Sequence, residues 1–198
     1  MENNTHETYK ELIDTYVKNK NLKEKSLVNE IFLLRPTLKI ELSTLSEILQ
    51  KISEEYNIPF RDIKCIGSAH TGFSFVKPKD SKEIKYFSED SDVDIAIINK
   101  NFFYYLYKLT ITTTNYFLDN REFKTQTVVE QFKTNILKGY IRPDTIGNRK
   151  FRRDWLRFFS DLSSEYNIKI SAAIYLDEDT LNNKIQESIR IYKKKLEE

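Results

Sequence analysis

The sequence has few residues of the kinds that crosslink, bend or anchor a chain: one cysteine, four glycines and four prolines among 198 residues. A single cysteine excludes a disulfide framework and a cysteine-rich zinc site. No apolar run approaches the roughly 18 residues that span a bilayer. The polar start, Met1 to Asn4, lacks the apolar core of a signal peptide. We therefore expect a cytoplasmic protein without membrane insertion.

Neither sign of charge dominates, because 32 Lys and Arg face 30 Asp and Glu, for a net charge of +2. Bulk charge therefore does not select a nucleic-acid partner, and any basic surface must be local. The length is that of one domain and is enough for a proper hydrophobic core.

Two of the scarce glycines lie in one short segment, Cys65 to Gly72, with the sequence CIGSAHTG. Glycine makes up about 7% of an average protein, so a glycine here marks a real demand of the backbone. Gly67 and Gly72 bracket Ser68 after an apolar strand expected at Asp62–Ile66. A tight turn that leads into a helix can present backbone N–H groups and a hydroxyl to a phosphate. The spacing matches neither the phosphate loop of common NTPases nor the dinucleotide fingerprint.

A second segment, Ser91 to Asn99, reads SDVDIAIIN and predicts a strand with two carboxylates. Side chains alternate along a strand, so Asp92 and Asp94 share one face while Val93 and Ile95 share the other. Two anions on one face repel unless they are exposed or bridged by cations, and Mg²⁺ is the usual hard cation. The apolar residues that follow predict a central strand buried on both faces.

Together the two segments resemble the nucleotidyltransferase superfamily typified by DNA polymerase β. The pattern of that family is an apolar residue, Gly-Ser, three residues, Gly, a loop, and Ser-Asp-x-Asp followed by aliphatic residues. The matching residues in this chain are Ile66-Gly67-Ser68, Gly72 and Ser91-Asp92-Val93-Asp94-Ile95. The resemblance implies an α/β (α+β) fold, in which a small mixed sheet is flanked by helices.

The same resemblance implies a Mg²⁺-dependent transfer of a nucleoside monophosphate from an NTP or dNTP to a hydroxyl acceptor. Asp92 and Asp94 would bind two Mg²⁺ ions, with Mn²⁺ as a possible substitute, and stabilise the attacking and leaving oxygens through them. The residues that would contact the nucleotide are Gly67, Ser68, Gly72 and Ser91.

The acceptor could be a protein, a nucleic-acid end, a second nucleotide or a small molecule. Small stand-alone members of this superfamily are frequent in bacterial toxin–antitoxin and phage-defence (antiviral) systems, so by fold-level analogy a co-encoded partner protein is one candidate acceptor. The alternative is a catalytically impaired relative that binds nucleotide or a partner protein.

The loop between the two halves of the motif is longer here than in minimal members of the family. Two short β-like runs, 73–78 and 83–87, flank the polar turn 79–82. Residues 73–90 are therefore predicted to form a hairpin insertion over the site.

The family places a third carboxylate on a later strand, which this sequence predicts at Asn167 to Leu176 and which contains no acid. Either Asp177 takes this catalytic role from a displaced position, or Ser171 or Ala173 occupies the position and the third ligand is missing. A site with two carboxylates can still bind metal, but it would lack the group that usually activates the attacking hydroxyl.

A basic and aromatic stretch runs from Arg149 to Arg157. On a helix, Arg149, Arg153 and Arg157 share one face at i, i+4 and i+8. Such a row favours anions, so Arg149 and Arg153 are candidate contacts for the nucleotide phosphates, and the stretch alone could bind nucleic acid. The alternative is a solvated face balanced by Asp154 and Asp161.

Periodicity predicts helices over much of the rest of the chain. Residues 1–58 are expected to form a helical N-terminal region that packs on a core of residues 59–198. Pro36 separates the second of its three helices from the third, and Pro59 closes the third. The other predicted helices are 101–109, 117–137 and 179–196.

Overall fold

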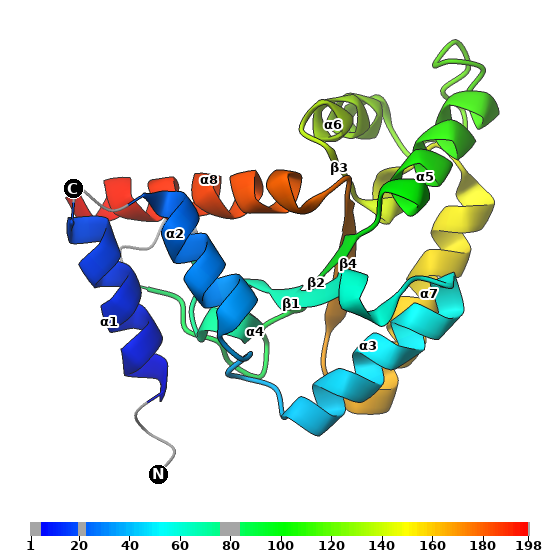
Figure 1. Ribbon diagram of the computed structural model, residues 1–198. Helices are drawn as coiled ribbons and strands as arrows, with labels where there is room; N and C mark the ends of the chain where they lie inside the picture. The colour runs from blue at the N-terminus through cyan, green and yellow to red at the C-terminus, as the bar shows by residue number, and fades with distance from the viewer. Residues whose placement is uncertain (1–4, 20–22, 76–83, 198) are drawn as a thin grey trace. The chain divides into compact units, whose positions relative to one another are not determined.

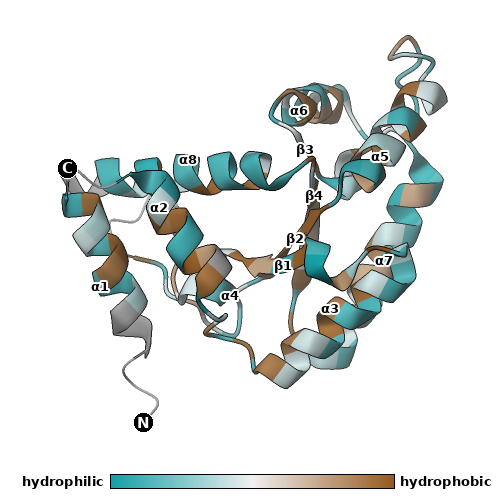
Figure 2. Ribbon diagram, viewed as in Figure 1, coloured by the Kyte–Doolittle hydropathy of each residue, from teal (hydrophilic) through white to brown (hydrophobic). Residues whose placement is uncertain are grey.

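The computed structural model describes residues 5–19, 23–75 and 84–197 and shows an α+β fold, as predicted (Figure 1). Its strands form one mixed four-stranded sheet with the order β1-β2-β4-β3. The strands are β1 (Ile63–Ile66), β2 (Val93–Ile98), β3 (Tyr140–Ile141) and β4 (Ile170–Tyr175). In Figure 2, β2 and β4 are largely coloured as hydrophobic, as expected for buried strands.

The helical elements follow the predicted periodicity in most places. They are α1 (Thr5–Lys18), α2 (Glu24–Val28), the π-helix η1 (Asn29–Leu34), α3 (Leu42–Tyr56), the 3₁₀ turn η2 (Phe60–Asp62), α4 (Gly67–Thr71), α5 (Lys100–Thr113), α6 (Gln126–Leu137), the 3₁₀ turn η3 (Pro143–Thr145), α7 (Arg149–Tyr166) and α8 (Glu178–Glu197). Within the described ranges, no helix is long and apolar enough to cross a membrane.

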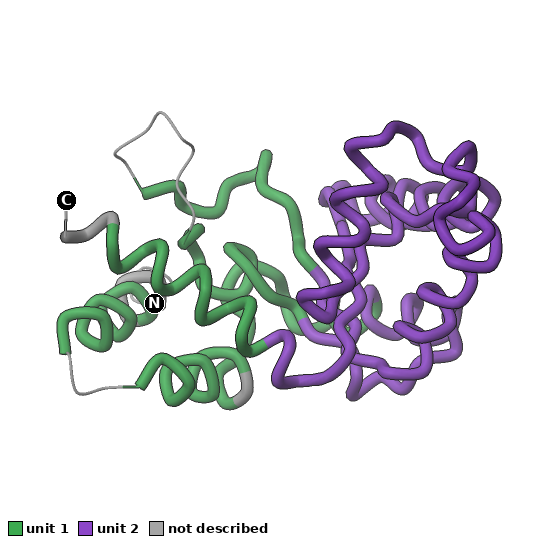
Figure 3. The backbone as a smooth tube through the Cα atoms, turned by 90° about the horizontal axis from the view of Figure 1, so that it is seen from above, with its two compact units in different colours: residues 1–47, 65–94, 182–198 green, residues 48–64, 95–181 purple. Residues whose placement is uncertain are grey.

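The chain divides into two compact units (Figure 3). Unit 1 consists of residues 1–47, 65–94 and 182–198, and unit 2 consists of residues 48–64 and 95–181. This division differs from the predicted boundary between residues 58 and 59. Most of α3 belongs to unit 2, and most of α8 belongs to unit 1.

The core of unit 1 joins residues that are far apart in the sequence. The ring of Tyr192 in α8 is fully buried and lies 5.6 Å from the ring of Phe73 and 5.9 Å from that of Phe75. Its hydroxyl donates a hydrogen bond of 2.8 Å to Asp14 in α1. The last helix therefore completes the unit that contains the first.

In unit 2, α3 packs against α7 through aromatic side chains. The ring of Tyr56 lies 4.8 Å from that of Trp155 and 5.4 Å from that of Phe158. Lys51 and Glu165 add an ion pair between the same two helices. These contacts explain why the second half of α3 belongs to unit 2.

The prediction of a helix over residues 117–137 is wrong in its first part, because only Gln126–Leu137 is helical. The chain leaves α5 through three consecutive residues with positive φ, Asn115, Tyr116 and Phe117. It enters α6 at Thr125, whose hydroxyl caps the helix by accepting a hydrogen bond from the N–H of Val128. A turn of this kind has no hydrophobic periodicity, so the spacing of apolar residues could not reveal that the helix begins only at Gln126.

Strand β3 was not predicted, because two residues are too short for any period. It pairs antiparallel with β4, and Tyr140 and Ile141 stand opposite Tyr175 and Ile174. It lies at one edge of the sheet.

Candidate active site

The two predicted carboxylates lie at the beginning of β2, on the face opposite to Val93 and Ile95. Val93 and Ile95 are buried, whereas Asp92 and Asp94 are half-buried. Alternation along the strand causes this difference, as predicted. The strand is wholly buried at Ala96 and Ile97, so the acids lie where it enters the core.

Gly67 lies directly against the Asp94 carboxylate. A Cβ atom placed on Gly67 would come within 2.7 Å of the Asp94 Oδ2 atom, closer than side-chain atoms approach one another. Gly67 also has a φ of +68°, a conformation that glycine adopts without strain. Both halves of the sequence motif therefore meet within unit 1, which is the geometry that the resemblance implied.

The turn after β1 becomes the short helix α4, in which Ala69, His70 and Thr71 are buried. Gly72 ends the helix in the left-handed conformation, with φ of +86°, and its N–H donates to the Ser68 carbonyl at 2.8 Å. Gly72 thus has a structural role of its own beside its predicted contact with a nucleotide. Ser68 belongs to the first turn of α4 and is half-buried.

The predicted hairpin insertion is present at its base. Phe73 and Tyr86 form an antiparallel bridge. The N–H of Ser74 donates to the Lys85 carbonyl at 2.9 Å, and the N–H of Phe87 donates to the Gly72 carbonyl at 2.9 Å. Residues 76–83, which include the predicted turn, lie outside the described residues.

Ser91 is buried and belongs to the turn that leads into β2. Its hydroxyl accepts a hydrogen bond of 2.9 Å from the N–H of Ser88. Its own N–H donates to the Ser88 carbonyl at 2.9 Å. This turn places Asp92 at the start of the strand, and the predicted contact of Ser91 with a nucleotide stays a prediction.

Asp177 caps α8. Its Oδ1 atom accepts hydrogen bonds from the Thr180 N–H at 2.8 Å and from the Thr180 hydroxyl at 2.7 Å. These bonds, together with the nearby positive charge of Lys100, hold the pKa of the Asp177 carboxyl below its usual value.

Asp177 follows the end of β4, where the Tyr175 carbonyl accepts a hydrogen bond of 3.2 Å from the N–H of Asn99, just beyond the carboxyl end of β2. Asp92 and Asp94 belong to the amino end of that strand. Asp177 belongs to unit 2, whereas Asp92 and Asp94 belong to unit 1, so the catalytic role of Asp177 stays a prediction. Over the described ranges, no group of three or more Asp, Glu, His or Cys side chains forms a cluster that could hold a metal ion.

The predicted row of arginines lies on α7, in unit 2. The backbone N–H of Arg149 donates to Glu122 Oε2 at 2.9 Å, and its guanidinium donates to the Arg121 carbonyl. Arg153 is 72% exposed, and its Nε lies 3.5 Å from Asp154. Lys150 and Arg157 also lie near Asp154, so this acid balances part of the exposed basic face. The predicted contacts of Arg149 and Arg153 with nucleotide phosphates stay a prediction.

Arg152, one residue from the exposed row, is a structural residue that the sequence reasoning missed. It is buried, and its Nη1 atom donates to the carbonyls of Ile146 at 2.6 Å and Glu122 at 3.0 Å. The sequence did contain a sign of this role. Arg152 does not share the i, i+4 spacing of the other arginines, which places it on another face of the helix.

Cys65 lies in β1 just before the turn and is buried, as predicted for a small core residue. The pKa of its thiol is raised to about 12, mainly by burial; the hydrogen bond with Thr37 opposes this rise, and the negative charge of Asp94 adds to it. The thiol therefore stays protonated and is a poor nucleophile.

The arrangement in unit 1 suits a divalent cation and the phosphate that the cation carries. Two half-buried carboxylates supply the oxygen ligands that Mg²⁺ prefers. The Gly67–Ser68 turn lies beside Asp94 and carries a hydroxyl. Comparison of the chain with protein-family models, with curated proteins and with solved structures finds no match.

Proposed function

We propose that this protein is a Mg²⁺-dependent nucleotidyltransferase, which transfers a nucleoside monophosphate from an NTP or dNTP to a hydroxyl acceptor. The acceptor hydroxyl loses its proton to solvent and its oxygen bonds to the α-phosphorus, while the bond from the α-phosphorus to the bridging oxygen breaks and pyrophosphate leaves. The observation that supports this proposal most directly is the contact between the Gly67 backbone and the Asp94 carboxylate. A reaction of this class needs metal-binding carboxylates beside a turn that receives phosphate, and this contact joins the two.

In the proposed reaction each residue has a defined task. Asp92 and Asp94 would hold the divalent ions, Mg²⁺ or Mn²⁺, which stabilise charge on the attacking and leaving oxygens when bound. The Ser68 hydroxyl and the backbone N–H groups of the turn would donate hydrogen bonds to the phosphate oxygens. Because Gly67 has no side chain, the phosphate can approach the backbone closely.

Transfer of labelled nucleotide tests the proposal. The purified protein would be incubated with Mg²⁺ and each labelled NTP or dNTP, with itself, nucleic acid or a co-encoded partner protein as acceptor. We expect transfer that is abolished in Asp92→Asn and Asp94→Asn, because an amide is a poor ligand for Mg²⁺. Asp90→Asn is the matched control, since Asp90 is exposed and lies outside the motif. Transfer that persists in both motif variants would contradict the proposal.

A second candidate function is nucleotide or partner binding without catalysis. One observation favours it. Asp177, the candidate for the third catalytic carboxylate, already accepts hydrogen bonds as the cap of α8. Calorimetric titration with Mg-ATP separates the two functions. Binding that depends on Asp94, without transfer of any nucleotide to any of the acceptors, would favour the binding module.

A further inference from the structure

The buried His70 side chain connects α4 to the N-terminal helices. Its Nε2 atom lies 2.8 Å from the Ile31 carbonyl, and its Nδ1 atom lies 3.0 Å from the Thr37 hydroxyl. Its ring stacks on Phe32 at 4.8 Å and meets the edge of Tyr9 at 6.3 Å. Both ring nitrogens are therefore satisfied by the segment Ile31–Thr37 when Nε2 carries the proton.

Two backbone hydrogen bonds join the same parts of unit 1. The N–H of Leu38 donates to the His70 carbonyl at 3.2 Å, and the N–H of Lys39 donates to the Ala69 carbonyl at 3.1 Å. These carbonyls belong to a helix of five residues, which cannot be stable without tertiary contacts. The orientation of the Gly67–Ser68 turn therefore depends on the segment Ile31–Lys39.

Thr37 extends this connection toward the acid pair. Its hydroxyl lies 3.0 Å from His70 Nδ1, and Thr37 is also close enough to Cys65 to lower the pKa of that thiol. Cys65 is close enough to Asp94 for the negative charge of that carboxylate to raise the pKa of the thiol. The N-terminal segment thus contacts the turn through His70 and the strand before the turn through Cys65.

We propose that His70 is a positioning residue, through which the segment Ile31–Lys39 holds the Gly67–Ser68 turn in the geometry that binds a nucleotide phosphate. This inference rests on the proposed function, because it names what holds and regulates the nucleotide site at Gly67–Ser68. Coupling between two sites is reciprocal. A nucleotide bound at the turn therefore also stabilises the N-terminal segment, and a partner that displaces this segment weakens nucleotide binding.

Substitution of His70 tests the proposal through nucleotide affinity. We expect His70→Ala to raise the Kd for Mg-ATP at least fivefold, about the effect of one lost hydrogen bond. His70→Gln restores most of the affinity, because its amide nitrogen can replace Nε2 as the donor to Ile31. Thr37→Val, which removes the partner of Nδ1, gives a smaller increase in Kd.

Tyr192→Phe is the matched control. It removes one hydrogen bond, to Asp14, in the same unit and without any described contact with α4. We expect a loss of stability, smaller than that of His70→Ala, and an unchanged Kd. If His70→Ala and Tyr192→Phe change the Kd equally, His70 acts only on stability and the inference is wrong.

Hydrogen exchange separates failure of the inference from failure of the proposed function. Without any nucleotide, the amides of Ala69 to Gly72 should exchange faster in His70→Ala than in Tyr192→Phe. If they do while the wild-type protein binds no nucleotide, the positioning role stands and the proposed function fails. If the wild-type protein binds Mg-ATP and neither exchange nor Kd changes in His70→Ala, the inference fails and the proposed function stands.

Discussion

Gly67 shows how one residue can meet two independent demands. Its φ of +68° requires the left-handed region, and its Cα faces the Asp94 Oδ2 atom at a distance that leaves no room for a Cβ. Either demand alone would favour glycine. Together they make the position sensitive to the smallest possible side chain.

Gly67→Ala tests this sensitivity. We expect a loss of about 1–3 kcal/mol in the free energy of unfolding, together with weaker Mn²⁺ binding because Asp94 must move. Gly139→Ala is the control, since it has a φ of +74° and its Cβ would come within 2.8 Å of Thr180, in unit 2. Urea unfolding and Mn²⁺ titration should show similar losses of stability but a change in metal affinity only for Gly67→Ala.

The Asp177 carboxylate is expected to matter for stability in a pH-dependent way. Its pKa is lowered in the folded protein by hydrogen bonds from Thr180. The stabilisation is therefore complete above the ordinary value of 3.8 and is lost as the pH falls through the lower folded pKa. We expect Asp177→Ala to cost about 1 kcal/mol at pH 7 and less near pH 3, measured by urea unfolding.

Asp177→Ser provides the comparison for that measurement, because a serine hydroxyl caps a helix without titrating. Its stability relative to Asp177→Ala should not depend on pH. The serine variant should also retain nucleotide transfer, since Asp177 is engaged with Thr180 at the start of α8. Loss of transfer with stability retained would instead give Asp177 a direct catalytic role.

At the scale of elements, α7 carries neighbouring arginines with opposite roles. Arg152 is buried and donates to two backbone carbonyls, whereas Arg153 is exposed. We expect Arg152→Met to cost about 2–4 kcal/mol, because it removes the donor to the buried Ile146 carbonyl and the half-buried Glu122 carbonyl. Arg153→Met should change stability by less than about 0.5 kcal/mol. Thermal unfolding of both variants checks this contrast.

The exposed face of α7 can also be tested for binding of polyanions. If Arg153 contacts nucleic acid, the logarithm of the affinity should fall steeply with the logarithm of the salt concentration, and Arg153→Met should reduce that slope. Asp94→Asn should leave the slope unchanged. A slope near zero in the wild-type protein would contradict nucleic-acid binding by this face.

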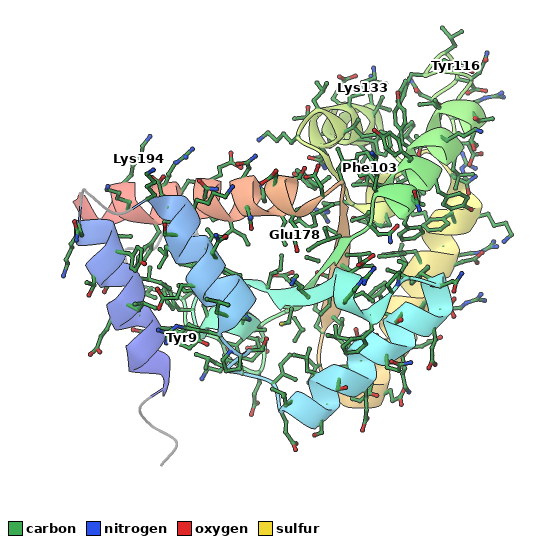
Figure 4. The ribbon with its side chains drawn as sticks, viewed as in Figure 1. Tyr9, Phe103, Tyr116, Lys133, Glu178 and Lys194 are labelled. Carbon is green, nitrogen blue, oxygen red and sulfur yellow. The ribbon has the colours of Figure 1, made fainter. Side chains whose placement is uncertain are left out.

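The loop after α5 is strained, because Asn115, Tyr116 and Phe117 all have positive φ. Phe117 is anchored by rings 6.3 Å away at Phe123 and 6.2 Å away at Phe132. Tyr116, by contrast, is 72% exposed and stands at the tip of the loop in Figure 4. The strain at Tyr116 is thus not offset by burial of its side chain.

Tyr116→Gly should therefore raise the free energy of unfolding by about 0.5 kcal/mol, because glycine adopts positive φ without strain. Tyr104→Gly is the control, since Tyr104 is half exposed within α5 and glycine there should cost about 1 kcal/mol. Chemical denaturation measures both changes. A loss of stability in Tyr116→Gly would show that the tyrosine makes a compensating contribution.

For the whole molecule, the main feature is that unit 1 combines three separated segments of the chain. We expect Tyr192→Ala to cost about 3–5 kcal/mol, because it empties the space beside Phe73 and Phe75. Hydrogen exchange should accelerate in α1, while the amides of α7 in unit 2 remain protected. Uniform acceleration in both units would show that they unfold as one.

The resemblance to a known motif, and no local pattern, led us to expect Gly67 beside Asp94. The sequence by itself determined the strands that carry the motif and most helices. These features depend on local periodicity and on glycine's conformational range, which neighbouring residues reveal. Only the tertiary structure decided that His70 is bonded to Ile31 and Thr37, that Asp177 caps α8, and that α8 completes the unit containing α1. Those outcomes depend on contacts between residues distant in the chain, and no local pattern encodes which distant partner a buried polar or aromatic side chain will meet.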